Sequence, residues 1–434
     1  MKLYSINNKN LEVSLREAVL QGLAPDGGLF MPRVLPQMSA EFFSTLEGRS
    51  LQDISYAVAH TLLEGDVPED VLRRIVEEAI NFDAPLTRLD DETYVLELFH
   101  GPTLAFKDFG ARFMARLMGH FVEGKDQELT ILVATSGDTG SAVAHGFLNV
   151  PGIRVIILYP SGGVSLTQEK MLTTLGGNIT ALEVKGTFDD CQKLVKQAFV
   201  DQELRGKLFM SSANSINIAR LIPQMFYYFY AYGQLVKMEK PVVFSVPSGN
   251  FGHLTAGLMA KRIGLPAAKF VAACNANDVV TDYLRTGQYK PRQSQKTLSN
   301  AMDVGSPSNF ARMLELYGQD VEKMRADVWS IGCTDAQTRE VIKEIYEKYN
   351  YILDPHGAVG YWGLKQYRAA HSGAGVGVFF ETASAAKFPE TVEEVLGIKV
   401  DVPERMRDYV SKEKQALLFQ NSFEALKAFL LSKI

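Results

Sequence analysis

Short apolar runs rich in β-branched and aromatic residues alternate with longer amphipathic stretches from about residue 93 onward. The runs have the length and composition of buried strands: TYVLELF, LTILVAT, RVIILYP, NITALEV, VVFSVPS, KFVAACN and GVGVFFE. Helical patterns lie between most of them. This alternation predicts an α/β protein with a mainly parallel sheet.

The chain before residue 93 has a different pattern. Amphipathic pieces such as LREAVLQGL and PEDVLRRIVEEAI predict a mostly helical segment over 1–92, and MKLYSINNKN predicts an edge strand. FYYFYAYGQLV predicts a buried or interface helix, and the polar stretch GQYKPRQSQKTLSN predicts an exposed loop. We expect an α/β core over 93–400, with a smaller subdomain at roughly 130–235, and a helical segment over 401–434.

Composition excludes several function classes. The net charge is −5 and neither end carries a basic tail, so the electrostatic footprint of a nucleic-acid binder is absent. No apolar run reaches the roughly 20 residues that span a bilayer, which argues against a membrane protein. The three cysteines are scattered, without the spacing of metal ligands, so we expect no metal site and a reducing, cytoplasmic setting.

Two predicted strands end in glycine loops that precede helices. The first loop is SGDTG, with Ser136, Asp138 and Thr139, and the second is SGNFG, with Gly249–Gly252. Ligands collect at the carboxyl ends of parallel strands, and a helix N-terminus there favours a phosphate. Ordinary strand–helix turns also use glycine, so each loop alone leaves both interpretations open.

Lys107 stands in HGPTLAFKDFG, flanked by Ala105, Phe106 and Phe109. Desolvation in such surroundings lowers the pKa of an amine, which is how lysines that form Schiff bases are activated. The alternative is a lysine at a helix start whose aliphatic stem passes the rings. An amine together with two anion loops favours an aldehyde cofactor that bears a phosphate, and pyridoxal 5'-phosphate is that cofactor.

Six ordered motifs resemble the threonine synthase family, in its longer bacterial and fungal branch: HGPTLAFKDFG, ATSGDTG, SANSINIAR, VPSGNFG, LSNAMDVGSPSN and FETASAAKF. The resemblance implies fold type II of the pyridoxal-phosphate enzymes, with two open, mainly parallel sheets flanked by helices and an extra N-terminal segment. It also implies conversion of O-phospho-L-homoserine and water to L-threonine and phosphate.

The same resemblance implies roles for individual residues. Lys107 matches the lysine that binds the cofactor, and Thr382 the hydroxyl residue that meets the pyridine nitrogen. Asp138 is expected near the 3′ oxygen of the ring. The residues that match the phosphate cradle are Gly249, Asn250, Phe251 and Gly252. The candidates for binding the substrate phosphate are Ser136, Thr139, Asn217 and Arg220; Arg220 binds phosphate bidentately or pairs with an acid on a helix surface.

The chain departs from the family pattern at two places. His253 follows the second loop, where the family usually has aspartate, and either binds a cofactor phosphate oxygen or caps the helix. Ser384 and Ala385 replace the usual histidine and proline, which leaves the shape of that loop and the role of the missing histidine open.

Two other functions compete with the synthase: a related phospholyase that gives a 2-keto acid, and a non-catalytic protein that binds pyridoxal phosphate. An intact Lys107 argues against the second, since binding alone needs no amine. The sequence leaves the oligomeric state open.

Overall fold

The computed structural model describes residues 1–433, which form two compact units. Unit 1 consists of Met1, Arg33–Phe106 and Leu221–Asp401, and unit 2 of Lys2–Pro32, Lys107–Arg220 and the chain from Val402 onward. Both units therefore combine segments that are distant in sequence. The sequence instead predicts consecutive segments with boundaries near residues 92 and 400, and that division stays a prediction.

The framework of unit 1 is a six-stranded sheet, in which five strands are parallel and only the outer strand β4 is antiparallel, to β5. Every residue of β10 and β13 is buried, as expected where helices cover both faces of a parallel sheet. In spatial order the strands are β12 (Val328–Gly332), β11 (Ala267–Cys274), β10 (Val242–Pro247), β13 (Val376–Glu381), β5 (Thr93–Glu97) and β4 (Leu86–Arg88).

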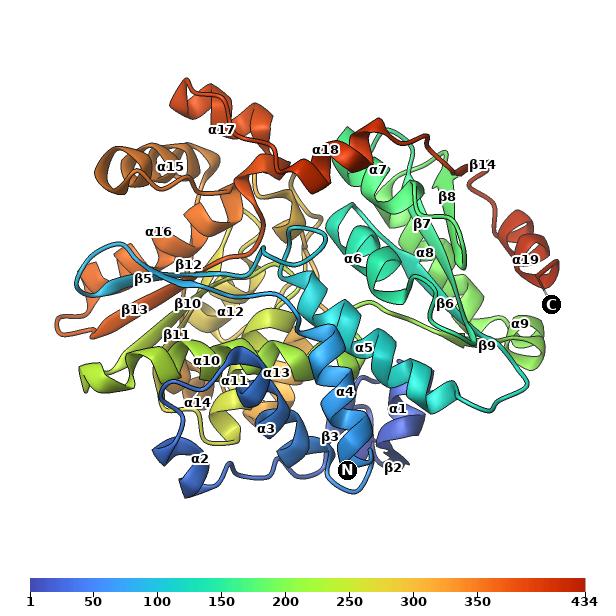
Figure 1. Ribbon diagram of the computed structural model, residues 1–434, viewed down its shortest axis with the longest axis horizontal. Coiled ribbons are helices and arrows are strands. Elements are labelled where there is room, and N and C mark those ends of the chain that lie inside the picture. The colour runs from blue at the N-terminus through green and yellow to red at the C-terminus, as the bar shows by residue number, and fades with distance from the viewer. Residues whose placement is uncertain (434) are drawn as a thin grey trace. The chain divides into compact units, whose positions relative to one another are not determined.

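Helices α11 (Gly252–Arg262) and α16 (Pro355–Ala370) pack on opposite faces of this sheet (Figure 1). A Cβ atom on Gly257 of α11 would lie 2.7 Å from the ring of Phe270, whereas one on Gly363 of α16 would lie 2.7 Å from Ala273. Because side chains three positions apart on a strand point to opposite faces, the two helices lie on different sides of β11. Glycine at both positions allows this close approach.

The other helices of unit 1 include two that the sequence predicted, α4 and the buried α10. The predicted loop over 287–300 has neither helix nor strand up to residue 299 and is largely exposed, which confirms it, although η4 begins at Asn300. The helices are α2 (Ala40–Ser44), α3 (Leu51–Leu63), α4 (Glu69–Ala79), α10 (Phe226–Leu235), α12 (Val279–Thr286), α13 (Phe310–Leu316), α14 (Val321–Asp327), α15 (Asp335–Tyr349) and α17 (Pro389–Leu396), with 3₁₀ turns η2 (Ile222–Met225), η3 (Val236–Met238), η4 (Asn300–Met302) and η5 (Ala385–Lys387).

Unit 2 contains a five-stranded, wholly parallel sheet and a small antiparallel one. The large sheet has the order β14 (Leu417–Phe419), β8 (Ile179–Val184), β7 (Ile153–Pro160), β6 (Leu129–Ala134) and β9 (Phe209–Ser211). The small sheet has the order β2 (Asn8–Ser14), β1 (Lys2–Ser5) and β3 (Phe30–Pro32). The prediction of an edge strand at the N-terminus was wrong, because β1 pairs with β2 on one side and with β3 on the other.

Helices pack against the large sheet of unit 2, and α8 and α19 share its apolar core through Leu194, Ala198 and Leu426. The fold class is confirmed: two open, mainly parallel sheets flanked by helices, with an additional N-terminal segment. No helix within residues 1–433 combines the length and apolar character needed to cross a bilayer. The helices of this unit are α1 (Leu15–Gln21), α5 (Lys107–Val122), α6 (Asp138–Phe147), α7 (Leu166–Thr173), α8 (Phe188–Val200), α9 (Gln202–Lys207), α18 (Glu404–Ser411) and α19 (Phe423–Leu431), with the 3₁₀ turn η1 (Ile218–Arg220).

Candidate active site

The segment that leads into Lys107 is fixed by the chain that follows β13. Within unit 1, the backbone N–H of Phe106 donates to the Thr382 carbonyl at 2.9 Å, and that of Ser384 donates to the Leu104 carbonyl at 3.1 Å. The buried Lys387 ammonium donates to the Thr103 carbonyl at 3.1 Å. Three bonds thus hold the residues directly before Lys107 against the segment that contains Thr382.

Leu104 in this segment has a φ angle of +55°, in the left-handed region. A leucine there is uncommon and costs energy, so it persists only where surrounding contacts impose it. Leu104 is 3% exposed, and its carbonyl accepts the bond from Ser384. The backbone strain therefore marks a segment whose position is dictated by its contacts.

Lys107 is the first residue of α5, and within unit 2 its Nζ atom lies 3.8 Å from Oδ2 of Asp138. Asp138 opens α6 at the end of the first glycine loop and is 5% exposed. Its other carboxylate oxygen accepts a hydrogen bond of 3.0 Å from Nε2 of Gln168. The loop thus places a fixed, buried carboxylate beside the lysine amine.

The first loop depends on its glycines. Gly137 has a φ angle of +137°, and a Cβ atom there would lie 2.5 Å from the side chain of Gln168. Thr135 Oγ1 accepts hydrogen bonds from the backbone N–H groups of Gly137 at 3.0 Å and Gly140 at 2.8 Å, which closes the turn. Ser136 is exposed and Thr139 is half-buried, so both hydroxyls lie near the surface of unit 2.

The second loop joins β10 to α11 in unit 1. Phe251 precedes the helix with a φ of +60°, and its side chain provides no cap for the N–H groups of the first turn. A Cβ atom on Gly249 would lie 2.5 Å from Cα of Met302, so only glycine fits. Asn250 Oδ1 accepts hydrogen bonds from the N–H of Ser308 at 2.7 Å and its hydroxyl at 2.9 Å.

His253, the second residue of α11, is 5% exposed and packs among aromatic rings. Its ring stacks on that of Phe106, with centroids 5.1 Å apart, and meets Phe380 edge-on at 4.6 Å. Burial lowers the pKa of His253 to about 3, so the ring is neutral. Among residues 1–433 neither of its ring nitrogens has a hydrogen-bond partner. Phe106 thus links His253 to Thr382.

Arg220 and Asn217 are both buried in unit 2. Arg220 donates from Nη1 to the Ala213 carbonyl at 2.7 Å, and burial lowers the pKa of its guanidinium to about 10, while the charge of Asp108 raises it. The Asn217 amide donates to the Val19 carbonyl at 2.8 Å and its oxygen accepts from the Ala219 N–H. These hydrogen bonds join the Asn217 side chain to the surrounding backbone, and its contact with substrate stays a prediction.

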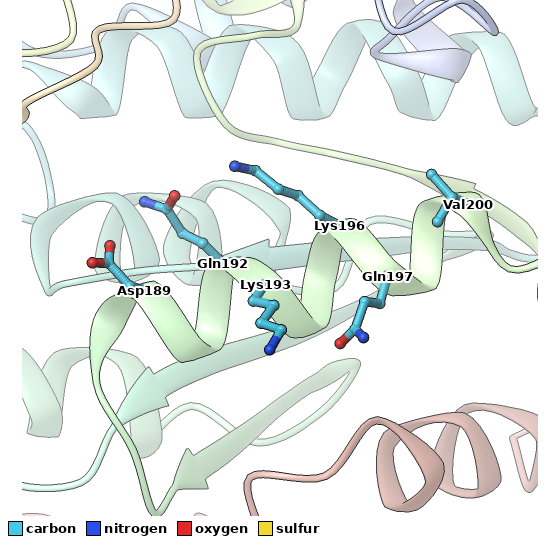
Figure 2. Close-up of a pocket in the computed structure, with 6 residues that line it drawn as sticks. All are labelled: Asp189, Gln192, Lys193, Lys196, Gln197 and Val200. Carbon is cyan, nitrogen blue, oxygen red and sulfur yellow. The ribbon is translucent and has the colours of Figure 1, made fainter. Parts of the chain in front are cut away.

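A shallow depression on the outer face of α8 is a separate feature (Figure 2). It is lined by polar side chains and Val200, and none of the predicted site residues belongs to it. Within residues 1–433 there is no group of three or more histidine, cysteine, aspartate or glutamate side chains placed to hold a metal ion.

Residues 82–381 match the family described as pyridoxal-phosphate dependent enzyme, residues 2–80 match the threonine synthase N terminus, and residues 357–430 match the C-terminal family of threonine synthase. Threonine synthase from Haemophilus influenzae is 46% identical over 433 residues, which cover 99% of this chain and 100% of that protein. This chain belongs to the threonine synthase family.

Two crystal structures extend the match to the fold. Threonine synthase from Escherichia coli superimposes with a TM-score of 0.92 at 42% identity, covering 100% of both chains. A structure of threonine synthase from Brucella melitensis with bound pyridoxal phosphate gives 0.93 at 35% identity, covering 99% of this chain and 98% of that one. The chain is a fold type II, pyridoxal-phosphate-dependent lyase of the threonine synthase family.

The residues present fit this cofactor. Lys107 supplies an amine, and the second loop offers an uncapped helix N-terminus behind a glycine that no other residue can replace. Sequence reasoning missed several supporting residues: Gln168, Met302 and Ser308. Met302 and Ser308 lie in the motif LSNAMDVGSPSN, which indicated the segment but not its contacts, whereas Gln168 lies outside all six motifs.

Proposed function

We propose that this chain converts O-phospho-L-homoserine and water into L-threonine and phosphate. The observation that carries the proposal is the match to threonine synthases along essentially the whole chain, with Lys107 present at the start of α5. The buried carboxylate of Asp138, 3.8 Å from the Lys107 amine, supports a site built for proton movement at that amine.

Lys107 would bind the cofactor covalently and, once displaced by the substrate amine, would take the Cα proton. When bound, pyridoxal phosphate supplies an electron-withdrawing ring that stabilises negative charge at Cα. The loop Gly249–Gly252 would hold its phosphate at the N-terminus of α11, where backbone N–H groups and the helix dipole favour an anion. Thr382 would meet the pyridine nitrogen with a neutral hydroxyl, and Asp138 would face the 3′ oxygen.

His253 remains a candidate for contact with the cofactor, and its packing suggests how it acts. Its neutral ring supports Phe106, the residue bonded to the Thr382 carbonyl and next to Lys107 in the chain. We therefore assign His253 to the shape of the cofactor site through Phe106, in addition to the direct phosphate contact expected from the sequence.

The substrate phosphate needs an anion site of its own. Ser136 and Thr139 present hydroxyls from the first loop, and Arg220 supplies a positive charge that burial strengthens electrostatically. Asn217 would act through its bonds to the backbone around Ser212 and Ala219, which hold the turn that carries Arg220.

One experiment tests this function. Purified enzyme is incubated with O-phosphohomoserine in ¹⁸O-labelled water, and phosphate, threonine and 2-oxobutyrate are quantified, the last two by mass spectrometry. We expect threonine with label in its hydroxyl. Mainly 2-oxobutyrate would favour the phospholyase, and a protein that binds pyridoxal phosphate without turnover would favour the non-catalytic alternative.

We also propose that the enzyme works in the cytoplasm. Cys191, Cys274 and Cys333 are all free thiols and buried, which is typical of a protein that matures in a reducing compartment.

A further inference from the structure

Asp354 and His356 form a buried pair at the start of α16 in unit 1. Asp354 is the N-cap of the helix and accepts from the backbone N–H groups of His356 at 2.7 Å and Gly357 at 3.4 Å. Nδ1 of His356 lies 2.5 Å from the same carboxylate. Residues Asp354 and His356 are 0% and 2% exposed, so water does not compete for these contacts.

The contacts of the His356 ring define its tautomer. The backbone N–H of Ala301 donates to Nε2 of His356 at 3.2 Å. Since an N–H group can only donate, Nε2 must accept, and the ring proton lies on Nδ1 and is donated to Asp354. The neutral imidazole thus bridges a helix cap and the backbone of a distant loop.

One end of this bridge reaches the residue before Thr382. The backbone N–H of Asp354 donates to Oε1 of Glu381 at 2.5 Å, and Glu381 is 1% exposed. Burial raises the pKa of Glu381 well above its usual value, and the neighbouring Asp354 charge raises it further, which favours the neutral carboxyl. A Cβ atom on Gly357 would lie 1.6 Å from Glu381 Oε2, which shows how closely the helix start fits the end of β13.

The other end reaches the phosphate cradle. Ala301 belongs to the turn η4, whose next residue, Met302, presents the Cα atom that leaves no room for a side chain on Gly249. Asp303 anchors the same turn, because its carboxylate accepts from Asn275 Nδ2 at 2.9 Å and from the Thr297 hydroxyl at 2.7 Å. A shift of Ala301 would therefore carry Met302 against or away from the cradle.

We propose that His356 is a positioning residue that ties the Thr382 end of the cofactor site to the phosphate cradle at Gly249. The proposal rests on the proposed function, which assigns Thr382 to the pyridine nitrogen and Gly249 to the phosphate. Because ring and phosphate belong to one nearly rigid molecule, a site that binds both must keep its two halves at a fixed separation. The chain Glu381, Asp354, His356 and Ala301 provides that constraint without touching the cofactor.

Two amide substitutions test the two hydrogen bonds of the His356 ring one at a time. In His356→Asn the side-chain amide falls near the Nδ1 position, which keeps the bond to Asp354 and leaves the Ala301 N–H unmatched. In His356→Gln the amide oxygen reaches the Nε2 position and accepts from Ala301. His371→Gln is the matched control, since His371 is the cap residue at the other end of α16 and its Nδ1 contacts only the local Tyr367 carbonyl in the described hydrogen bonds.

The measurement is the dissociation constant of pyridoxal phosphate, obtained by titrating apoenzyme and following the visible absorption band of the bound cofactor. We expect His356→Asn to weaken binding about tenfold, the equivalent of one buried hydrogen bond. His356→Gln should recover most of that affinity, and His371→Gln should match the wild type. Circular dichroism of each apoenzyme confirms folding.

Equal affinities for His356→Asn and wild type, or equal losses in His356→Asn and His356→Gln, would overturn the proposal. If His356→Asn does not fold, His356→Gln decides alone: affinity within threefold of the wild type supports the proposal, and a tenfold loss overturns it. The titration contains no substrate, so a protein that shows this pattern but makes no threonine would refute the proposed function and leave the role of His356 intact.

Discussion

Nζ of Lys107 lies 3.8 Å from Oδ2 of Asp138, and the amide of Gln168 holds the other oxygen of that carboxylate. A buried carboxylate beside the amine gives the displaced lysine a nearby charge partner. Lys107→Ala should therefore abolish both the covalent cofactor linkage and turnover. Borohydride reduction followed by peptide mass spectrometry should locate the cofactor on Lys107 in the wild type only.

Lys107→Arg is the matched control, because it keeps the charge beside Asp138 but cannot form the linkage at neutral pH. It should fold with near-wild-type thermal stability and remain inactive. Normal turnover by either variant would refute the assignment of Lys107.

Gly249→Ala should weaken cofactor binding at least tenfold, because its Cβ atom would lie 2.5 Å from the backbone of Met302 and would displace the cradle. Gly206→Ala is the control: Gly206 lies in α9 with no atom within 4 Å of an added Cβ, and alanine there favours the helix by up to about 1 kcal/mol. Both dissociation constants are measured by titrating apoenzyme with pyridoxal phosphate. Equal affinities would place the phosphate elsewhere.

Gly110→Ala should mimic the loss of Arg220. A Cβ atom on Gly110 would lie 2.8 Å from Nε of Arg220 and 3.1 Å from its carbonyl oxygen, so the guanidinium must move. Arg220→Ala and Gly110→Ala should both raise the KM for O-phosphohomoserine, by one to two orders of magnitude for a lost charged contact. Both should also shift the product ratio towards 2-oxobutyrate. An unchanged KM in Arg220→Ala would remove Arg220 from the substrate site.

The buried His253 predicts a loss of stability in acid. Its pKa falls from 6.5 in the unfolded chain to about 3 in the fold, so the unfolded state binds the extra proton as the pH drops below 6.5. The neutral buried ring therefore costs no stability above pH 6.5, and the free energy of unfolding falls progressively from there towards pH 3. The fall between pH 7 and pH 5 is about 2 kcal/mol.

Urea unfolding of the apoenzyme at several pH values tests this. His253→Phe removes the titrating ring from its aromatic surroundings, so the difference in unfolding free energy between pH 7 and pH 5 should shrink by about 2 kcal/mol relative to the wild type. An unchanged difference would mean that His253 does not titrate as a buried group. If His253 also contacts the cofactor phosphate directly, His253→Phe should in addition weaken cofactor binding, which the same titration measures.

The strands that the sequence predicted are those whose signal is local. All seven apolar runs became strands because β-branched residues buried on both faces leave little alternative. Three-residue strands such as β4, β9 and β14 have no such signal, since partners distant in sequence stabilise them. The prediction that β1 is an edge strand failed for the same reason, because the residues of a strand do not encode whether it has a second neighbour.

The candidate site divides in the same way. Lys107, the two loops and Thr382 are visible because the chemistry demands particular residue types in particular patterns. The contacts that hold these residues in place cannot be predicted from the sequence, because the partners are far apart along the chain. Gln168 lies 30 residues from Asp138, and Ser308 lies 58 residues from Asn250. His253 is the instructive case, since its position beside the loop suggested a phosphate contact or a cap, whereas the fold surrounds its ring with aromatic side chains.

The interleaving of the two units along the chain has a consequence for biosynthesis. A growing polypeptide contains every segment of unit 1 only once Asp401 has been synthesised, and at that moment unit 2 still lacks α18, β14 and α19. The apolar surface around Leu194 and Ala198 that α19 covers therefore stays exposed until α19 has left the ribosome. The helix that carries Lys107 belongs to unit 2, so the surroundings of this lysine within its unit are complete only after the segment from Val402 onward has been synthesised.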